Sequence, residues 1–193
     1  MPTIIINDET IEAATGETIL AIARRHALLI GFLCDGRGMC QTCECYVQAG
    51  TEHLSPPNNI EQNWQTTEQL AQGYRLGCQA TLLGPGPIRL ITRAEDIWRK
   101  TGAIIAPPLD TRTGADLGEL VQTLGGINQR FFQRFPLNIV NTLPQFAKMP
   151  PNLPGVQQYI NDRWRITARQ IGRKRPANAA TRPTEEESGE RGG

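Results

Sequence analysis

The sequence predicts an α+β domain over residues 1–93, an α-helical extension over 94–175 and a disordered tail over 176–193. Three observations support this division. Short β-branched runs bounded by turn residues fill the first part, with one amphipathic segment between them. Helical apolar spacing interrupted by prolines fills the second part. The last part consists mainly of Pro, Ala, Thr, Glu and Gly, a composition that buries too little apolar surface to fold.

Residues 1–93 contain the signals of a small sheet with a helix across it. Apolar runs at 3–7 and 10–13 flank a turn and predict a hairpin. Thr18 is the expected N-cap of a helix that ends near His26, because the residues after Thr18 are apolar at helical spacing. Further strands and one polar helical stretch complete the expected domain: strands at 44–48, 78–82 and 88–92, and a helix at about 60–71.

Residues 94–175 are expected to form helices between proline breaks. The segment 117–124 carries leucine and valine at positions i, i+3, i+4 and i+7, which form one apolar helix face. The segment 127–135 holds three phenylalanines with arginines between them. The longest candidate helix is 155–172, with apolar residues along one side: Ile160, Trp164, Ala168 and Ile171.

Charge is unevenly distributed along the chain, although the net charge is only +1. Residues 1–93 carry six Arg, no Lys and nine acidic residues, whereas residues 94–175 carry twelve Lys or Arg and six acidic residues. The two parts therefore face different surroundings. The sequence contains no apolar run long enough to span a bilayer. We expect a cytoplasmic protein, and peripheral attachment to a membrane complex is the alternative.

Four of the five cysteines lie within twelve residues, and the remaining one stands apart. The spacing is Cys34-x5-Cys40-x2-Cys43, and thirty-four further residues separate Cys43 from Cys78. This clustering favours a metal site in a reducing compartment over a disulfide scaffold. Thiolates are the soft ligands that iron–sulfur clusters require, and a [2Fe–2S] cluster needs four of them.

The cysteine loop resembles that of the [2Fe–2S] ferredoxins. The matching residues are Cys34-Asp-Gly-Arg-Gly-Met-Cys40-Gln-Thr-Cys43 and, later, Arg75-Leu-Gly-Cys78-Gln. The five-residue first gap is similar to the adrenodoxin-like branch, since the plant-type branch has four residues there. The resemblance covers about residues 1–93. It implies a β-grasp fold and a [2Fe–2S] cluster bound by Cys34, Cys40, Cys43 and Cys78.

Other readings of these residues remain open. A structural zinc site usually pairs two short Cys-x2-Cys knuckles, and this sequence has one. Cys45 follows Cys43 by two residues, and we expect a buried free thiol there; a substitute ligand or a redox-active thiol is the alternative. His26 and His53 lack the pairing with cysteines that a Rieske-type site requires. Arg37, expected on the rim above the cluster, is either an ordinary loop residue or a partner contact.

The expected function is one-electron transfer between redox protein partners, a reductase or an electron acceptor, through the face formed by residues 31–45. The sequence has no nucleotide-binding loop and no legible acid–base pair, so we expect a carrier rather than an enzyme. All-cysteine ligation favours a low potential, roughly −400 mV in plant-type ferredoxins. The alternative is an assembly or scaffold subunit whose cluster is structural or sensory. Residues 60–71 hold only two acidic residues, which predicts weak long-range steering towards basic partners.

Three interpretations of residues 94–175 follow from their basic and aromatic composition. The helices pack back on the domain and cover one face of the sheet, or they dock the carrier to a larger redox or photosynthetic complex. The third interpretation is peripheral contact with an anionic membrane surface. Nucleic-acid binding fits only the basic run and is not expected. The basic run consists of Arg163, Arg165, Arg169, Arg173, Lys174 and Arg175.

Overall fold

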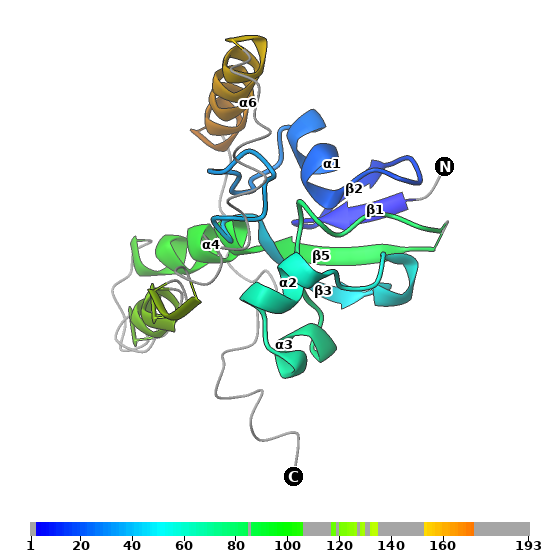
Figure 1. Cartoon of the computed structure of the whole chain (residues 1–193). Helices are drawn as coiled ribbons and strands as arrows, with labels where there is room; N and C mark the ends of the chain where they lie inside the picture. The colour runs from blue at the N-terminus through cyan, green and yellow to red at the C-terminus, as the bar shows by residue number, and fades with distance from the viewer. Residues whose placement is uncertain are drawn as a thin grey trace.

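The structure is a computed structural model of the 193-residue chain (Figure 1). It describes residues 3–84, 86–105, 117–118, 120–126, 128–129, 132–134 and 153–171. The tail expected from residue 176 lies outside the described residues, and so do residues 127, 130, 131 and 135 of the phenylalanine-rich segment. Within the described part, no helix is both long enough and apolar enough to cross a lipid bilayer.

A five-stranded mixed sheet forms the centre of the N-terminal domain, in the order β2-β1-β5-β3-β4. Figure 1 labels the strands β1, β2, β3 and β5 of this sheet. β1 (Thr3–Ile6) pairs antiparallel with β2 (Glu9–Glu12) and parallel with β5 (Ile88–Thr92). β3 (Glu44–Ala49) pairs antiparallel with β5 and with β4 (Tyr74–Leu76). The first and last strands of the domain therefore lie side by side, as expected of a β-grasp fold.

The helix α1 (Ile19–Arg25) packs its apolar face on this sheet. Thr18 Oγ1 accepts a hydrogen bond from the backbone N–H of Ala21 at 3.2 Å, which caps the first turn. Ile19 and Ile22 are fully buried in the same hydrophobic core as the inward residues of β1 and β5. The capped helix predicted between Thr18 and His26 is confirmed.

Two short helices occupy the stretch where the sequence predicted one. After β3 and the 3-10 turn η1 (Thr51–His53), α2 (Asn59–Trp64) and α3 (Thr67–Ala71) follow in succession. Each begins with a capping box: the N-cap side chain accepts a hydrogen bond from the backbone N–H of the third helical residue, and the side chain of that third residue accepts one from the N-cap backbone N–H. The pairs are Asn58 with Glu61 and Thr66 with Gln69. The box opened by Thr66 starts a new helix, which explains the break.

The strand predicted at 78–82 is wrong in position. The observed strand β4 ends at Leu76, and Thr81 and Leu82 form only isolated bridges with Thr18 and Leu54. The backbone turns after Leu76, whose carbonyl accepts hydrogen bonds from the N–H groups of residues 79 and 80. This turn directs residue 78 towards the cysteine loop.

The helix α4 (Arg93–Ile105) begins directly at the end of β5, and one buried ion pair, Arg93–Glu44, joins it to the sheet. Arg93 binds Glu44 of β3, with Nε 3.2 Å from Oε1. Arg99 binds Asp8 at 3.0 Å and Glu95 at 2.9 Å. Arg93 and Arg99 of α4 therefore pair with Glu44 and Asp8 of the domain that the predicted boundary after Arg93 would end.

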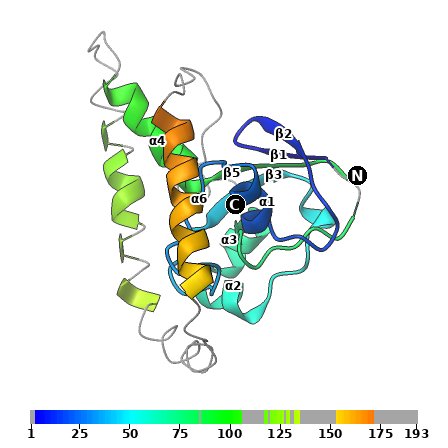
Figure 2. The ribbon, with the colours of Figure 1, turned by 90° about the horizontal axis from the view of Figure 1, so that it is seen from above.

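The helix α6 (Leu153–Ile171) packs back against α1, as Figure 2 shows. Ile166 is buried in the hydrophobic core, and the Tyr159 ring meets the Phe32 ring edge-on at 5.2 Å. The return of this helix to the domain agrees with one of the three interpretations. The position of α6 differs from the expected one. It contacts α1 and the segment before Cys34 instead of covering a face of the sheet.

The apolar side expected for this helix faces outward. Ile160, Trp164 and Ile171 are 42%, 70% and 82% exposed. Side chains at 159, 162, 166 and 170, which include an aspartate and a glutamine, occupy the inner face. Apolar spacing alone did not identify the buried side, because Asp162 is paired with an arginine of α1.

The Glu61–Arg75 ion pair links α2 to β4 and is almost completely buried, with side chains 0% and 1% exposed. Replacing Glu61 by Ala leaves the Arg75 guanidinium buried without its carboxylate, so the free energy of unfolding should fall by ~3–5 kcal/mol. Guanidinium denaturation followed by circular dichroism measures this loss. Glu52, whose side chain is 72% exposed, provides the control substitution Glu52→Ala. Equal midpoints for the two variants would contradict the assignment.

Candidate metal centre

The loop from Cys34 to Cys43 winds through left-handed backbone conformations. Gly36 and Gly38 have φ angles of +82° and +72°, which only glycine adopts without strain. A Cβ atom at residue 38 would also lie 2.5 Å from Cγ2 of Ile60. Both the turn and the close approach to α2 therefore require glycine at this position.

The four cysteines of the predicted site come together as two hydrogen-bonded pairs. The Cys34 thiol is paired with the Cys40 thiol, and the Cys43 thiol with the Cys78 thiol. The backbone N–H of Cys34 also donates to Cys40 Sγ at 3.3 Å. Two pairs fit a two-iron cluster, in which each iron takes two thiolates.

A single metal ion fits this arrangement less well. A structural zinc ion needs four ligands converging tetrahedrally on one point. The four thiols of this site form two separate pairs instead. The donor set of two thiol pairs agrees with a [2Fe–2S] cluster.

Backbone and side-chain donors surround the sulfur atoms. The N–H groups of Arg37, Met39 and Cys40 point to the sulfur of Cys34, and that of Gly38 to the sulfur of Cys78. Two side chains add further contacts: Gln79 Nε2 lies 3.2 Å from Cys78 Sγ, and Thr42 Oγ1 lies 3.0 Å from Cys40 Sγ. Such donors stabilise negative charge on thiolates and on a cluster that they hold.

The same pairing divides the protons unequally between the four thiols. The hydrogen bond from Cys40 lowers the pKa of Cys34 to about 5, and the hydrogen bond from Cys43 lowers the pKa of Cys78. The pKa values of Cys40 and Cys43 are raised in return by the same hydrogen bonds. Each pair thus already contains one favoured thiolate, the form that binds metal.

Side chains outside the loop hold it in place. Trp64, completely buried in α2, donates from Nε1 to the carbonyl of Gly38 at 2.6 Å. Gln79 donates from Nε2 to the carbonyl of Gly36 at 3.3 Å, and the N–H of Gly77 donates to the carbonyl of Cys43 at 2.9 Å. These bonds join the turn that carries Cys78 to the loop.

Sequence reasoning did not identify Thr42, Trp64 or Gln79 as supports of the site. One signal was available for Trp64, an apolar side chain in a largely polar helical stretch. A buried indole N–H needs an acceptor, and glycine-rich loops present free carbonyls. Gln79 carried no such signal, because its role depends on the turn after β4.

The other residues considered for the site have separate roles. Cys45 is fully buried, and its thiol lies 3.5 Å from the carbonyl of Arg75. His26 caps the C-terminus of α1, and His53 lies in η1 beside Glu52. Arg37 bonds the carbonyl of Cys34 at 2.9 Å, which makes it a support of the loop; its contact with a partner stays a prediction.

A family model described as a 2Fe-2S iron-sulfur cluster binding domain matches residues 4–83. Over 96 residues, the chain is 36% identical to Chlorosome protein I and 40% identical to Chlorosome protein J, both of Chlorobaculum tepidum. These matches cover 50% of this chain and 39% and 43% of the two relatives, so the chain spans less than half of their length. The 2Fe-2S ferredoxin of Escherichia coli K12 is 37% identical over 73 residues, which cover 36% of this chain and 64% of that protein.

A solved structure is also similar to this chain. It is the ISC-like [2Fe-2S] ferredoxin (FdxB) of Pseudomonas putida JCM 20004, which is 25% identical in sequence. The similarity has a TM-score of 0.43 and covers 49% of this chain and 94% of the ferredoxin. Each of these matches covers half of this chain or less.

Replacing Cys45 by Ser should leave the visible absorption of the purified protein unchanged, because the Cys45 thiol donates to the carbonyl of Arg75 in β4, while the four site cysteines pair with one another. The matched substitution Cys43→Ser removes one member of a pair and should abolish that absorption. Absorbance between 400 and 600 nm, normalised to protein, provides the measurement. Loss of the spectrum in the Cys45 variant would make Cys45 a ligand and overturn the assignment of the pairs.

Proposed function

Residues 4–83 belong to the [2Fe–2S] ferredoxin family, and we propose that the chain is a one-electron carrier whose cluster is held by Cys34, Cys40, Cys43 and Cys78. The observation that carries this proposal is the pairing of the four thiols inside a ring of N–H donors. The bound cluster supplies a centre that accepts and releases one electron at a time. Hydride transfer would need a further cofactor.

The protein residues prepare this site for a change of one negative charge. Burial of Cys43 and Cys78 limits solvent access, while the N–H donors to the sulfur atoms favour the more negative, reduced state. These donors are fixed by the loop backbone and need no rearrangement when charge arrives. All-cysteine ligation keeps the expected potential below that of a cluster with histidine ligands.

The face around the cysteine loop is the proposed site of electron exchange with a reductase or an acceptor. Leu33, next to Cys34, is 65% exposed, and Cys40 is only partly buried. An exposed apolar residue beside the cluster allows close approach of a partner, and electron transfer needs a short path. Redox proteins are therefore the proposed partners, and a catalytic role as an enzyme is not proposed.

The C-terminal half is proposed to hold the carrier on a larger redox or photosynthetic complex. In the described residues, exposed large apolar side chains gather there: Leu117, Val121, Leu124, Phe132, Ile160, Trp164 and Ile171. On α6 these side chains accompany exposed arginines, while the acidic residue Asp162 faces inward. An apolar and basic surface fits an apolar, acidic partner surface. The relatives named as chlorosome proteins support a photosynthetic setting.

A scaffold subunit with a structural or sensory cluster is the second candidate. The packing of Ile166 and Tyr159 of α6 against the ferredoxin domain favours it. An EPR-monitored redox titration separates the two functions. A carrier should show reversible one-electron reduction, with the reduced signal gained and lost over a single Nernst curve. A cluster that dithionite does not reduce, or that decays on reduction, would contradict the carrier and favour the scaffold.

Removal of the outward apolar residues of α6 should release the protein from its complex. In the host that makes the chain, the double variant Trp164→Ala, Ile171→Ala should move from the large-particle fraction to the supernatant, with unchanged cluster absorbance. Leu83→Ala is the control, because Leu83 is 55% exposed on the ferredoxin domain. A double variant that still sediments would contradict docking through α6. Flotation of the pure protein with phosphatidylglycerol vesicles would assign the face to a lipid surface instead.

A further inference from the structure

Arg24 of α1 stands between the cysteine loop and the C-terminal helix α6. Its Nη1 lies 2.6 Å from Oδ1 of Asp35, the residue that follows Cys34. Its Nε and Nη2 lie 2.9 and 2.8 Å from Oδ2 of Asp162 on α6. One guanidinium therefore bonds two carboxylates that are 127 residues apart in the sequence.

The bond to Asp35 bears directly on the geometry of the loop. Asp35 has a φ angle of +50°, a conformation that is uncommon for a residue with a side chain. Its backbone N–H donates to the carbonyl of Phe32 at 2.9 Å, which sets the turn that presents Cys34. Fixing the Asp35 carboxylate helps to hold this turn against the more extended conformations that the residue prefers.

An aromatic contact reinforces the link to α6. The Arg24 guanidinium lies 4.7 Å from the centre of the Phe32 ring, and the Tyr159 ring of α6 packs on that ring from another side. Arg163 of α6 approaches the same ring at 5.7 Å. The segment that enters the cysteine loop is thus held by one residue of α1 and two of α6.

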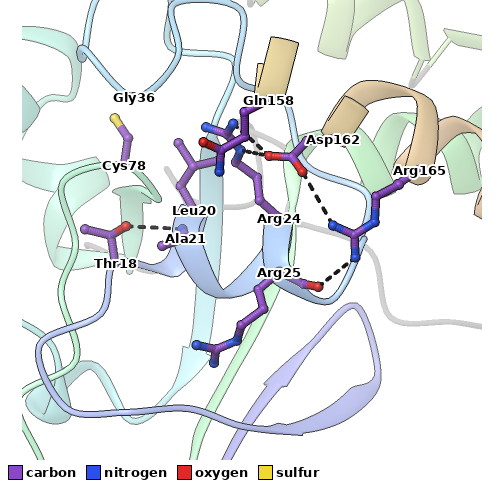
Figure 3. A pocket seen from close by; sticks show the side chains of 10 residues that line it. All are labelled: Thr18, Leu20, Ala21, Arg24, Arg25, Gly36, Cys78, Gln158, Asp162 and Arg165. Atoms are coloured by element: carbon purple, nitrogen blue, oxygen red, sulfur yellow. Dashed lines mark hydrogen bonds and ion pairs between the residues drawn. The ribbon is translucent and has the colours of Figure 1, made fainter. Parts of the chain in front are cut away.

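Part of the boundary between α1 and α6 is open. A cavity of about 600 Å³ separates the two helices, and Gly36 and Cys78 line it together with residues of both helices (Figure 3). Asp162 stands at this cavity between Arg24 and Arg165, and Arg165 also donates to the carbonyl of Arg25 at 3.2 Å. At this cavity polar contacts join the two helices, whereas Ile166 and Tyr159 of α6 make apolar contacts with the domain elsewhere.

We propose that Arg24 is a positioning residue for the cluster loop and that α6 acts on the loop through it. Asp162 orients the guanidinium, and the guanidinium orients Asp35 beside the ligand Cys34. The C-terminal half then contributes to how tightly the cluster is retained, in addition to any docking. This inference rests on the cysteine ligands of the proposed function.

The test is the rate at which the oxidised protein loses its cluster to excess bathophenanthroline, followed by visible absorbance. Arg24→Gln and Asp162→Asn change the net charge in opposite directions, yet each breaks the bridge. Both should therefore accelerate cluster loss roughly tenfold, as expected for one charge-assisted hydrogen bond. Arg24→Lys keeps the positive charge but lacks the planar guanidinium that bonds both carboxylates, so it should also accelerate cluster loss. The double variant should be no faster than either single variant.

Arg25→Gln is the matched control, because Arg25 is the neighbouring arginine of α1 and pairs instead with Glu17. It should lose its cluster at the wild-type rate. A second readout separates positioning from general stability: the g-values of the reduced cluster should shift in the Arg24 and Asp162 variants and stay fixed in the control.

Two results would overturn the proposal. Cluster loss at the wild-type rate in Asp162→Asn would show that α6 does not act through Arg24. This variant tests the proposal even where Arg24→Gln fails to fold. Equal acceleration in Arg25→Gln would show that the effect is not specific to the Arg24 bridge. Failure of the electron-carrier function would appear separately: the variants would lose their clusters at the expected relative rates, but the wild-type cluster could not be reversibly reduced.

Discussion

Convergence of four thiols, three from one loop and Cys78 from the turn after β4, is the constraint on which the rest of the domain depends. Thiolates repel one another, so they stay together only where donors and metal offset their charge. The loop supplies backbone donors by running through left-handed conformations at Gly36 and Gly38. The glycines serve two purposes, since residue 38 also lies against α2 with no room for a side chain.

The architecture supplies the last thiol from a distant part of the sequence. β4 pairs with β3, the strand that directly follows the loop, and the turn after Leu76 returns Cys78 to it. The buried Glu61–Arg75 pair fixes β4 to α2, and Trp64 of α2 holds the loop. The sheet, the short helices and the cysteines therefore form one connected framework, and α6 adds a further support through Asp162 and Arg24.

Much of this could be predicted from the sequence, because local signals carry it. The hairpin, the Thr18 cap and the strands at Glu44–Ala49 and Ile88–Thr92 follow from periodicity and capping, and the cysteine spacing indicates the kind of centre. The position of β4 and the inner face of α6 did not follow. Both depend on contacts distant in sequence: a turn that serves Cys78, and an aspartate buried because an arginine of α1 pairs with it.

Metal and sulfide analysis of the purified protein tests the central claim most directly, since the two thiol pairs imply two irons rather than one ion. About two irons and two acid-labile sulfides per chain are expected, with no zinc. Mössbauer spectra of the reduced protein should then contain one ferric and one ferrous site. A single metal ion per chain, whether iron or zinc, with no acid-labile sulfide would contradict the assignment of a two-iron cluster.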